Sequence, residues 1–412
     1  MTDIKFPSKV IHILEKLNKN GYQAYVVGGA IRDSLLMRNP KDWDIATNAI
    51  PDVVENMFNK TIPTGKQYGT ISINLDGDIF EVTTYRLETD YDGRRPNVVE
   101  FSTNFMDDLK RRDFTINAMA MGMDGVLIDP FNGKEHLELG LIECVGNAHD
   151  RIEEDKLRAL RAVRFASRYD FTISEDILEE IILVDIKQLS SERIRDEFNK
   201  IIMSEFPYRW IKFLLEIGLF TKIFPNKNRA TVRMDSNNST WKGLSKINGG
   251  LTGRLAVFFG DVYYCTDDIA TIMKSLKYSN NEIADVVRIL DHCNDVLDTH
   301  SDFKNFIVNV GEENLDKVFD FKLTNNIIRG SKKSVWKACF GALECNKIIE
   351  SGCALRIGDL ALDGRDLLSL GYEGEAIGKA LNVLLKHVWK YPMCNTPETL
   401  KSVLEKENCN EK

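Results

Sequence analysis

The sequence predicts an α+β region at the amino terminus, followed by a longer all-helical region. Residues 71–75 alternate apolar and polar side chains, which is the two-residue period of a strand with one buried face. Asp76-Gly77 is a typical hairpin turn, and residues 79–86 (IFEVTTYR) provide the returning strand. From about residue 150 the apolar residues recur every three or four positions instead, which indicates helices.

Composition excludes several classes of protein. The chain has 412 residues, 43% of them hydrophobic, which is enough for several domains with their own cores. A formal net charge of −8 excludes a globally basic nucleic-acid-binding protein, although not a local basic surface. No apolar run is long enough to span a membrane, and residues 1–22 lack the apolar core of a secretory signal. Eight cysteines without a CxxC pair favour a cytoplasmic protein with reduced thiols.

The first predicted strand, residues 24–27 (AYVV), ends in Gly28-Gly29, and a helical pattern follows. Glycines between a strand and a helix let backbone N–H groups approach a phosphate closely. Gly29 is therefore a candidate nucleotide contact, and Arg32, one turn into the helix, could reach the same phosphates. Considered alone, the two glycines would more often be an ordinary tight turn.

Three acidic residues of the head are candidate metal ligands. Asp42 and Asp44 open the next β-prone run, and residues two apart in a strand share one face. Glu81 lies in the returning strand, on the face opposite Phe80 and Val82. Three carboxylates on neighbouring strands suit a two-magnesium phosphoryl-transfer site. An isolated Asp-x-Asp, however, is more often a solvated turn.

The most informative helix is expected over residues 153–168. Arg158, Arg161 and Arg164 recur at every third position and form one ridge, which we call the arginine ridge. Asp155, three residues before Arg158, is expected beside it on the same helix. A carboxylate that accepts from an exocyclic amino group, next to a guanidinium that donates to a ring nitrogen, would accept cytosine and adenine. Guanine and uracil present the reverse pattern and would be rejected.

Five ordered motifs within residues 20–200 carry a family resemblance. They resemble the polymerase-β-type nucleotidyltransferases, in the branch of tRNA nucleotidyltransferases and poly(A) polymerases, and most of all the class II (bacterial-type) CCA-adding enzymes. In this family a glycine usually follows the Leu-Leu pair, where this chain has Met37-Arg38. The motifs are residues 28–47, 80–86 (FEVTTYR), 110–120 (KRRDFTINAMA), 128–137 (IDPFNGKEHL) and 153–171.

The resemblance implies a domain organisation and an activity. It implies a nucleotidyltransferase head in residues 1–146, a neck that recognises the base in 147–205, a body in 206–330 and a tail that binds tRNA in 331–412. The implied reaction is template-independent addition of the 3′-terminal CCA of tRNA from CTP and ATP, with release of pyrophosphate. No membrane is involved, and the oligomeric state is left open.

The resemblance also implies roles for single residues. Asp42 and Asp44 would bind Mg²⁺, with Glu81 as the third catalytic carboxylate, and Asp113 would position the backbone and side chains of its own motif. Residues 89–96 would provide a flexible element needed to switch from C to A addition. The nucleotide-binding residues would be Gly29, Arg32, Arg112, Asp155, Arg158, Arg161 and Arg164.

Three alternatives to a complete CCA-adding enzyme remain. They are a bacterial poly(A) polymerase, an enzyme that adds only A and works with a separate CC-adding partner, and a non-catalytic RNA-binding relative. Basic residues beyond the arginine ridge, Arg193 among them, are candidate contacts to tRNA phosphates. Each of them is individually more often a solvated charge.

Overall fold

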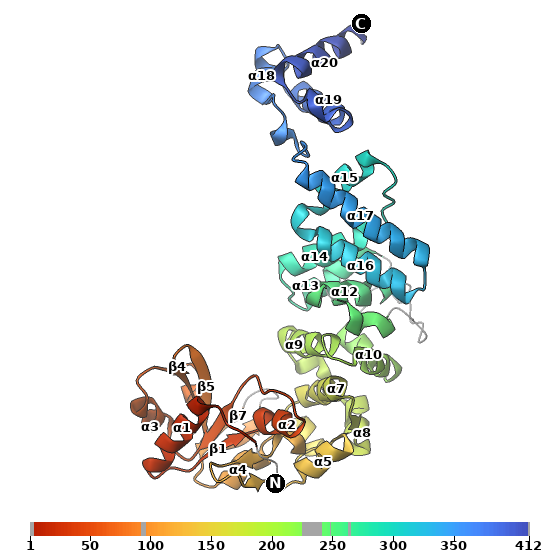
Figure 1. Ribbon diagram of the computed structural model, residues 1–412. Helices are drawn as coiled ribbons and strands as arrows, with labels where there is room; N and C mark the ends of the chain where they lie inside the picture. Colours follow the sequence, from red (N-terminus) through yellow and green to blue (C-terminus); the bar gives the residue numbers. More distant parts are fainter. Residues whose placement is uncertain (1–3, 92–95, 225–240, 248, 263–264, 411–412) are drawn as a thin grey trace. The chain divides into compact units, whose positions relative to one another are not determined.

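The computed structural model describes residues 4–91, 96–224, 241–247, 249–262 and 265–410. The chain divides into two compact units, residues 1–227 and residues 228–412. The first contains a mixed sheet with helices, and the described elements of the second are all helical (Figure 1). The predicted fold class is therefore confirmed, whereas the finer division into four domains stays a prediction.

The first unit is built around a seven-stranded sheet with the strand order β3-β4-β5-β2-β1-β8-β9 (Figure 1). Neighbouring strands are antiparallel except for β2 and β5, which are parallel. The strands are β1 Ala24–Val27, β2 Asp44–Thr47, β3 Thr61–Ile62, β4 Thr70–Leu75, β5 Asp78–Thr84, β8 Ala120–Met121 and β9 Leu127–Ile128.

The hairpin between β4 and β5 forms where the sequence predicts it. Ile71 and Ile73 are fully buried, and Asp76 and Gly77 have φ angles of 51° and 92°. Positive φ at both central residues gives the turn a twist that matches the strands on either side, which is why Asp-Gly is favoured there.

A second hairpin joins β6 (Arg86–Tyr91) to β7 (Pro96–Phe101). Both ends of the expected flexible element over residues 89–96 therefore lie in paired strands, because Thr89 pairs with Val98 and Tyr91 with Pro96. Extended residues in β6 and β7 allow the ladder of backbone hydrogen bonds to reach Tyr91. Residues 92–95 lie outside the described part of the chain.

Helices accompany the sheet in the first 140 residues. They are α1 Ser8–Lys19, α2 Gly29–Leu35, α3 Pro51–Met57, α4 Phe105–Lys110 and α5 Gly133–Leu139. The apolar face of α1, which includes Val10, Ile13 and Leu17, is fully buried, and the helix contacts β1. After α2, Met37 has a φ angle of 56°, so this chain keeps a backbone conformation that glycine favours.

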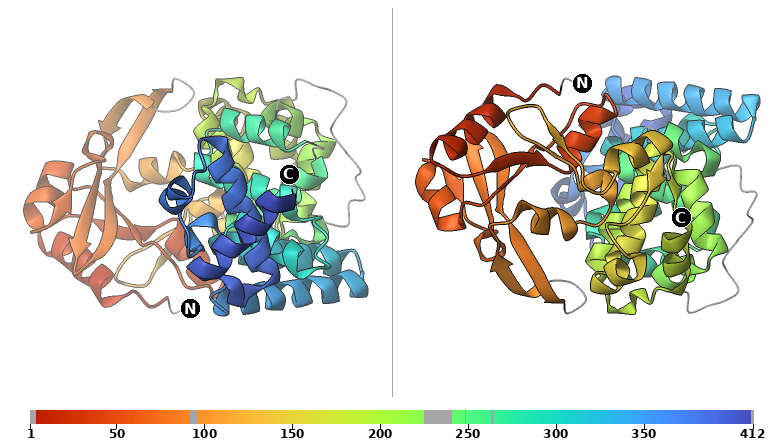
Figure 2. Two further views of the ribbon diagram at one scale, coloured as in Figure 1. Left: turned by 90° about the horizontal axis from the view of Figure 1, so that it is seen from above. Right: turned by 90° about the horizontal axis from the view of Figure 1, so that it is seen from below.

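The rest of the first unit is a group of helices beside the sheet (yellow to light green in Figure 2). The expected helix over 153–168 is wrong in one respect, because it breaks at Asp155-Lys156. Asp155 has an extended backbone (φ −146°, ψ 101°), and its Oδ1 accepts a hydrogen bond from the Leu157 backbone N–H. Asp155 therefore caps a new helix. The helices are α6 Ala148–Glu154, α7 Leu157–Tyr169, α8 Glu175–Leu183, α9 Ser191–Ile202, α10 Pro207–Glu216 and α11 Leu219–Ile223, and β10 (Leu141–Ile142) pairs with β11 (Thr172–Ile173).

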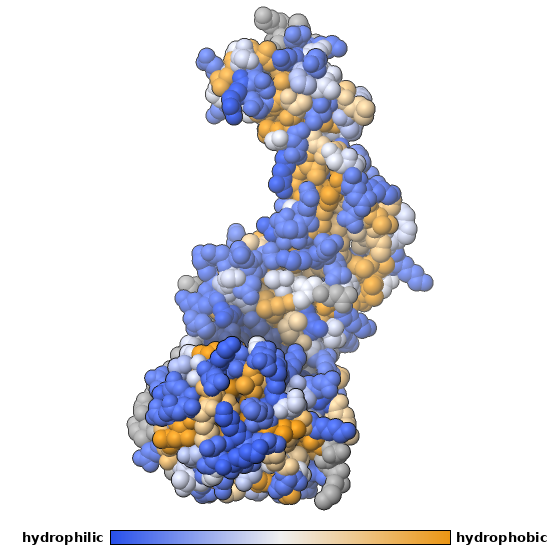
Figure 3. Space-filling model, turned by 60° about the vertical axis from the view of Figure 1, so that its left-hand side comes forward, coloured by the Kyte–Doolittle hydropathy of each residue, from blue (hydrophilic) through white to orange (hydrophobic). Residues whose placement is uncertain are grey.

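The second unit contains helices α12 Gly250–Val262, α13 Thr266–Ser275, α14 Asn280–His292, α15 His300–Val310, α16 Leu315–Ile328, α17 Lys332–Glu350, α18 Gly364–Ser369, α19 Glu375–Lys390 and α20 Pro397–Asn410. The last three share an apolar core with Leu367, Leu384 and Leu400 at its centre, all fully buried. Hydrophilic and hydrophobic residues are both exposed on the surface that Figure 3 shows. Among the described residues, no helix combines the length and the apolar character needed to cross a membrane.

Candidate active site

A cavity of about 810 Å³ lies within the first unit. One side consists of residues from the sheet and the turn after β1, and the other consists of residues from α7 and α9. Of the predicted site residues, only Asp42 is not part of this lining. Those that line the cavity are Gly29, Arg32, Asp44, Glu81, Arg112, Asp155, Arg158, Arg161 and Arg164.

The sheet places two carboxylates side by side. Because β2 and β5 are parallel with Ile45 opposite Val82, Asp44 and Glu81 are neighbours one step earlier in the ladder. Burial, the negative charge of Glu81 and that of the exposed Asp42 raise the pKa of Asp44 to about 6, against the opposing effect of Arg112. Among the described residues, these three carboxylates have no hydrogen-bond or ion-pair partner.

The carboxylates do not by themselves form a closed metal cage. No group of three or more His, Cys, Asp or Glu side chains in the described part of the chain could hold a metal ion. Mg²⁺ is commonly bound through one or two carboxylates, with the remaining ligands supplied by substrate phosphates and water. The raised pKa of Asp44 reflects first its burial and then the like charges of Glu81 and Asp42, and a bound divalent cation would offset these charges. The residues present therefore fit a metal ion that is bound by these carboxylates and, for its remaining ligands, by the phosphates of a nucleotide and water.

The turn after β1 brings Gly28 close to Arg112. Gly28 has a φ angle of 68°, and a Cβ atom added to it would lie 2.7 Å from Arg112 Nη1. Arg112 donates to Asp108 Oδ2 (3.0 Å) and to the Asn117 carbonyl (3.3 Å), while its Nε is buried without a partner among the described residues. The glycine therefore leaves space for a guanidinium at the edge of the cavity.

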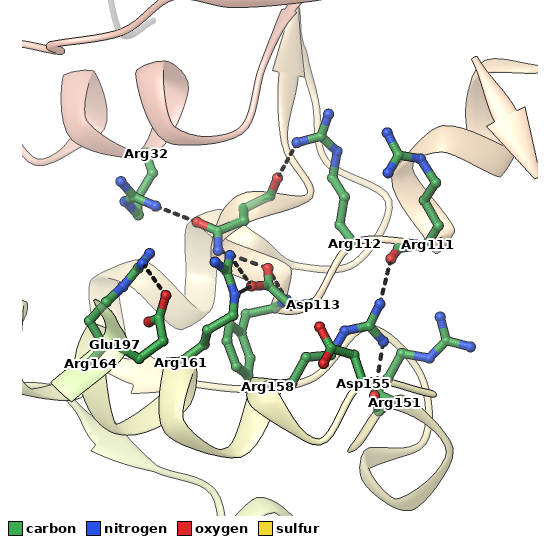
Figure 4. A network of polar contacts seen from close by, with 12 residues as sticks. Arg32, Arg111, Arg112, Asp113, Arg151, Asp155, Arg158, Arg161, Arg164 and Glu197 are labelled. Carbon is green, nitrogen blue, oxygen red and sulfur yellow. Dashed lines mark hydrogen bonds and ion pairs between the residues drawn. The ribbon is translucent and has the colours of Figure 1, made fainter. Parts of the chain in front are cut away.

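Asp113 links the basic motif to helix α7 (Figure 4). It accepts hydrogen bonds from the Phe114 backbone N–H (2.8 Å), from Asn117 Nδ2 (2.9 Å) and from Arg161 Nε (2.8 Å) and Nη2 (2.6 Å). Burial opposes ionisation, but Arg161 and these hydrogen bonds lower the pKa of Asp113 overall. The expectation that Asp113 positions the backbone and side chains of its motif is confirmed.

Arg32 is connected to the same network. Its Nη1 donates to Asn117 Oδ1, and its Nε donates to Asp33 Oδ1 at 2.8 Å. Asp33 also accepts from Arg168 (2.9 Å) and from the Tyr169 hydroxyl (2.7 Å). A buried carboxylate thus fixes Arg32 against the end of α7.

The arginine ridge lines the cavity as predicted, and each of its members has its own carboxylate. Figure 4 shows the pairs of Arg161 and Arg164. Arg158 pairs with Glu154 (2.7 Å), Arg161 with Asp113 (2.6 Å) and Arg164 with Glu197 (3.2 Å). The opposite side of α7 is fully buried, as expected, at Ala159, Leu160, Val163 and Ala166.

Asp155 and Arg158 both line the cavity, but they are not paired with each other. Asp155 Oδ2 accepts from Arg193 Nη2 at 2.8 Å. Arg158 donates to Glu154 and also to the carbonyls of Arg151 (3.0 Å) and Arg111 (3.2 Å). The two residues are still neighbours, because the Arg158 backbone N–H donates to the Asp155 carbonyl at 2.9 Å. Only the expectation that they share one continuous helix is wrong.

Comparisons with known proteins match both the head and the helices that follow it. A family described as "Poly A polymerase head domain" matches residues 24–143, and "Probable RNA and SrmB- binding site of polymerase A" matches residues 170–230. The CCA-adding enzyme of Oceanobacillus iheyensis is 45% identical over 214 residues, which are 51% of this chain and 54% of that protein, so this alignment spans about half of the relative. That of Lactobacillus delbrueckii subsp. bulgaricus is 35% identical over 402 residues, 92% of this chain and 95% of that protein.

The chain belongs to the CCA-adding enzymes. A crystal structure of the Bacillus stearothermophilus CCA-adding enzyme in complex with CTP has a TM-score of 0.82 and 27% identity, and the match covers 99% of both chains. The predicted resemblance to the bacterial class II enzymes is therefore confirmed.

Three residues of this CCA-adding enzyme's cavity network were missed from the sequence. Asn117 could have been found, because it lies only four residues after Asp113, in the same motif. Glu197 and Arg193 belong to α9, 33 positions after Arg164 and 38 after Asp155 respectively. No local pattern connects residues so far apart. Arg193, which was named only as a possible tRNA contact, lines the cavity.

Proposed function

We propose that this protein builds or repairs the 3′-terminal CCA of tRNA, using CTP and ATP without a nucleic-acid template and releasing pyrophosphate. The observation that carries the proposal is a single cavity with acidic residues on one side and the arginine ridge on the other. Family membership supports it, as does the likeness to a relative that binds CTP.

In the proposed reaction, the tRNA 3′-hydroxyl attacks the α-phosphate of the nucleotide. Asp42 and Asp44 would hold Mg²⁺, and Glu81, beside Asp44 in the sheet, would accept the proton of the attacking hydroxyl. When bound, Mg²⁺ supplies charge stabilisation for the attacking and leaving oxygens. Gly29, Arg32 and Arg112 lie where they can contact the triphosphate. The buried Nε of Arg112 is a donor still available for this contact.

Base selection is proposed for Asp155 and Arg158. A guanidinium has five N–H donors, and Arg158 uses three of them on Glu154 and two carbonyls. Its Nε–H and one Nη2–H have no partner among the described residues and can donate to a ring nitrogen. Asp155 likewise accepts one hydrogen bond on each oxygen, which leaves lone pairs for an exocyclic amino group. Arg161 and Arg164 would complete the wall behind the base.

The decisive experiment is nucleotide incorporation into tRNA that lacks CCA, with CTP, ATP or both. We expect two additions with CTP alone and three with both nucleotides. A long ladder with ATP alone would indicate a poly(A) polymerase, and addition of A only to tRNA that already ends in CC would indicate an A-adding enzyme. No incorporation under any condition would indicate a non-catalytic RNA-binding relative.

A further inference from the structure

Arg193 is the side chain that holds the Asp155 carboxylate in place. It projects from the first turn of α9, and its Nη2 donates to Asp155 Oδ2 at 2.8 Å. The side chains of Arg193 and Asp155 are 19% and 16% exposed, so water screens the pair only weakly. Asp155 Oδ1 is fixed separately by the Leu157 backbone N–H. Together these two contacts fix both the position and the rotation of the carboxylate.

The contacts of Arg193 indicate a dedicated role. Asp155 is the only partner of its side chain among the described residues, and Nη1 is buried without any. A buried donor without a partner lowers stability, so stabilisation of the fold alone does not explain the residue. Two other arginines of the cavity have more partners, since Arg158 bonds to three residues and Arg112 to two.

We infer that Arg193 is a positioning residue for nucleotide selection: it holds Asp155 so that the carboxylate meets the exocyclic amino group of cytosine or adenine. The inference rests on the proposed function, and specifically on the role of Asp155. The helix break makes this support necessary, because Asp155 lies between α6 and α7 and not within a helix. Without Arg193, one oxygen of the carboxylate would lose its only described partner, and the side chain could rotate.

The test compares Arg193→Ala with the wild-type full-length protein on tRNA lacking CCA, with CTP and UTP as competing nucleotides. Loss of one charge-assisted hydrogen bond corresponds to about a 10- to 100-fold loss of preference for CTP. We expect this loss as a higher KM for CTP, with the KM for tRNA unchanged. Arg193→Lys should recover part of the preference.

Two further variants make the result specific. Arg195→Ala removes the same charge from the same helix, but Arg195 pairs with the adjacent Asp196 and does not line the cavity, so the preference for CTP should stay at the wild-type level. In an Asp155→Ala background, Arg193→Ala should have no further effect on preference, because both act through one carboxylate. Arg193→Lys and Arg193→Gln retain most of the side-chain length and provide the same test if the alanine variant does not fold.

The possible failures are distinguishable. Equal loss of CTP and UTP incorporation in Arg193→Ala, or independent effects of the two substitutions in the double variant, would overturn the inference and leave the proposed function intact. If the wild-type protein incorporates no CTP, the proposed function and this inference are both overturned.

Discussion

The two sides of the cavity differ in how their charges are compensated. On the sheet side, Asp44 and Glu81 have no ion-pair partner among the described residues, and neither has Asp42, which lies just outside the lining. The pKa of Asp44 is raised to about 6 by burial and by its acidic neighbours. On the helical side, each of the three arginines of the ridge is paired with its own carboxylate. The sheet side therefore carries uncompensated negative charge, whereas each arginine of the ridge on the helical side already has a carboxylate partner.

The largest effect is expected on the sheet side, from removal of a metal ligand. Asp42→Ala or Asp44→Ala should reduce the rate of nucleotide incorporation by about 10³-fold or more, because the transition state loses several kcal/mol of charge stabilisation. Binding of tRNA, measured in parallel, should be retained. Asp78→Ala is a matched control, since Asp78 is an exposed residue of the same strand as Glu81 and pairs with Lys9. Near-normal turnover in either aspartate variant would contradict the assignment.

A second prediction concerns stability on the helical side. Asp113→Asn should lower the free energy of unfolding at pH 7 by about 1–3 kcal/mol, because it leaves the half-buried Arg161 without its carboxylate. The folded pKa of Asp113 lies below its unfolded value, so its contribution is present above about pH 4 and is lost as the pH falls through the folded value. Urea unfolding of both proteins between pH 3 and 7 measures the difference in their free energies of unfolding. Equal stability of variant and wild type at pH 7 would show that the Asp113–Arg161 ion pair does not stabilise the fold.

Nucleotide preference provides the third prediction. Asp155→Ala or Arg158→Ala should weaken discrimination against UTP and GTP by about 10- to 100-fold, which corresponds to one or two unpaired polar groups. The metal ligands are untouched, so incorporation of CTP should continue. Wild-type discrimination in both variants would show that these residues only support the wall of the cavity.

The smallest effect is expected for Asp44→Asn, which should stabilise the protein, whereas Asp113→Asn should destabilise it. Asp44→Asn should raise the free energy of unfolding of the metal-free protein at neutral pH by about 1–2 kcal/mol, since about 1.4 kcal/mol corresponds to one pKa unit and partial exposure reduces the effect. The folded pKa of Asp44 is raised, so the wild type loses stability as the pH rises from about 4 to 6. The difference between the proteins should therefore shrink towards pH 4. A variant less stable than wild type at pH 7 would contradict the unpaired state of this carboxylate.

Features set by neighbouring residues could be predicted from the sequence. The Asp76-Gly77 turn requires only that two residues accept positive φ, and the arginine ridge requires only helical spacing. The carboxylates could be predicted for the same reason, since Asp44 and Glu81 each lie on a definite face of a strand. Their position side by side depends on the pairing of β2 with β5, which lie more than 30 positions apart in the sequence and which no local pattern connects.

Features set by distant partners could not be predicted. The residues around Asp155 are good helix formers, so the break before α7 is decided by competition between a continued helix and a new cap on Leu157. Aspartate is favoured at the start of a helix, and this preference is the local feature of the sequence that indicates the break. The ion-pair partner of Asp155, Arg193, lies on α9, 38 positions away, and no local pattern connects the two residues.

The hydrogen-bonded series from Arg32 through Asn117 to Asp113 and Arg161 also restricts how such a protein can evolve. Asp113 and Arg161 are 48 positions apart, yet each satisfies a buried polar group of the other. A single replacement leaves a group unsatisfied at a cost of about 1–3 kcal/mol, a substantial part of the margin by which a domain stays folded. Neutral drift at one position is therefore blocked until the other changes, so the distant motifs are inherited as a unit.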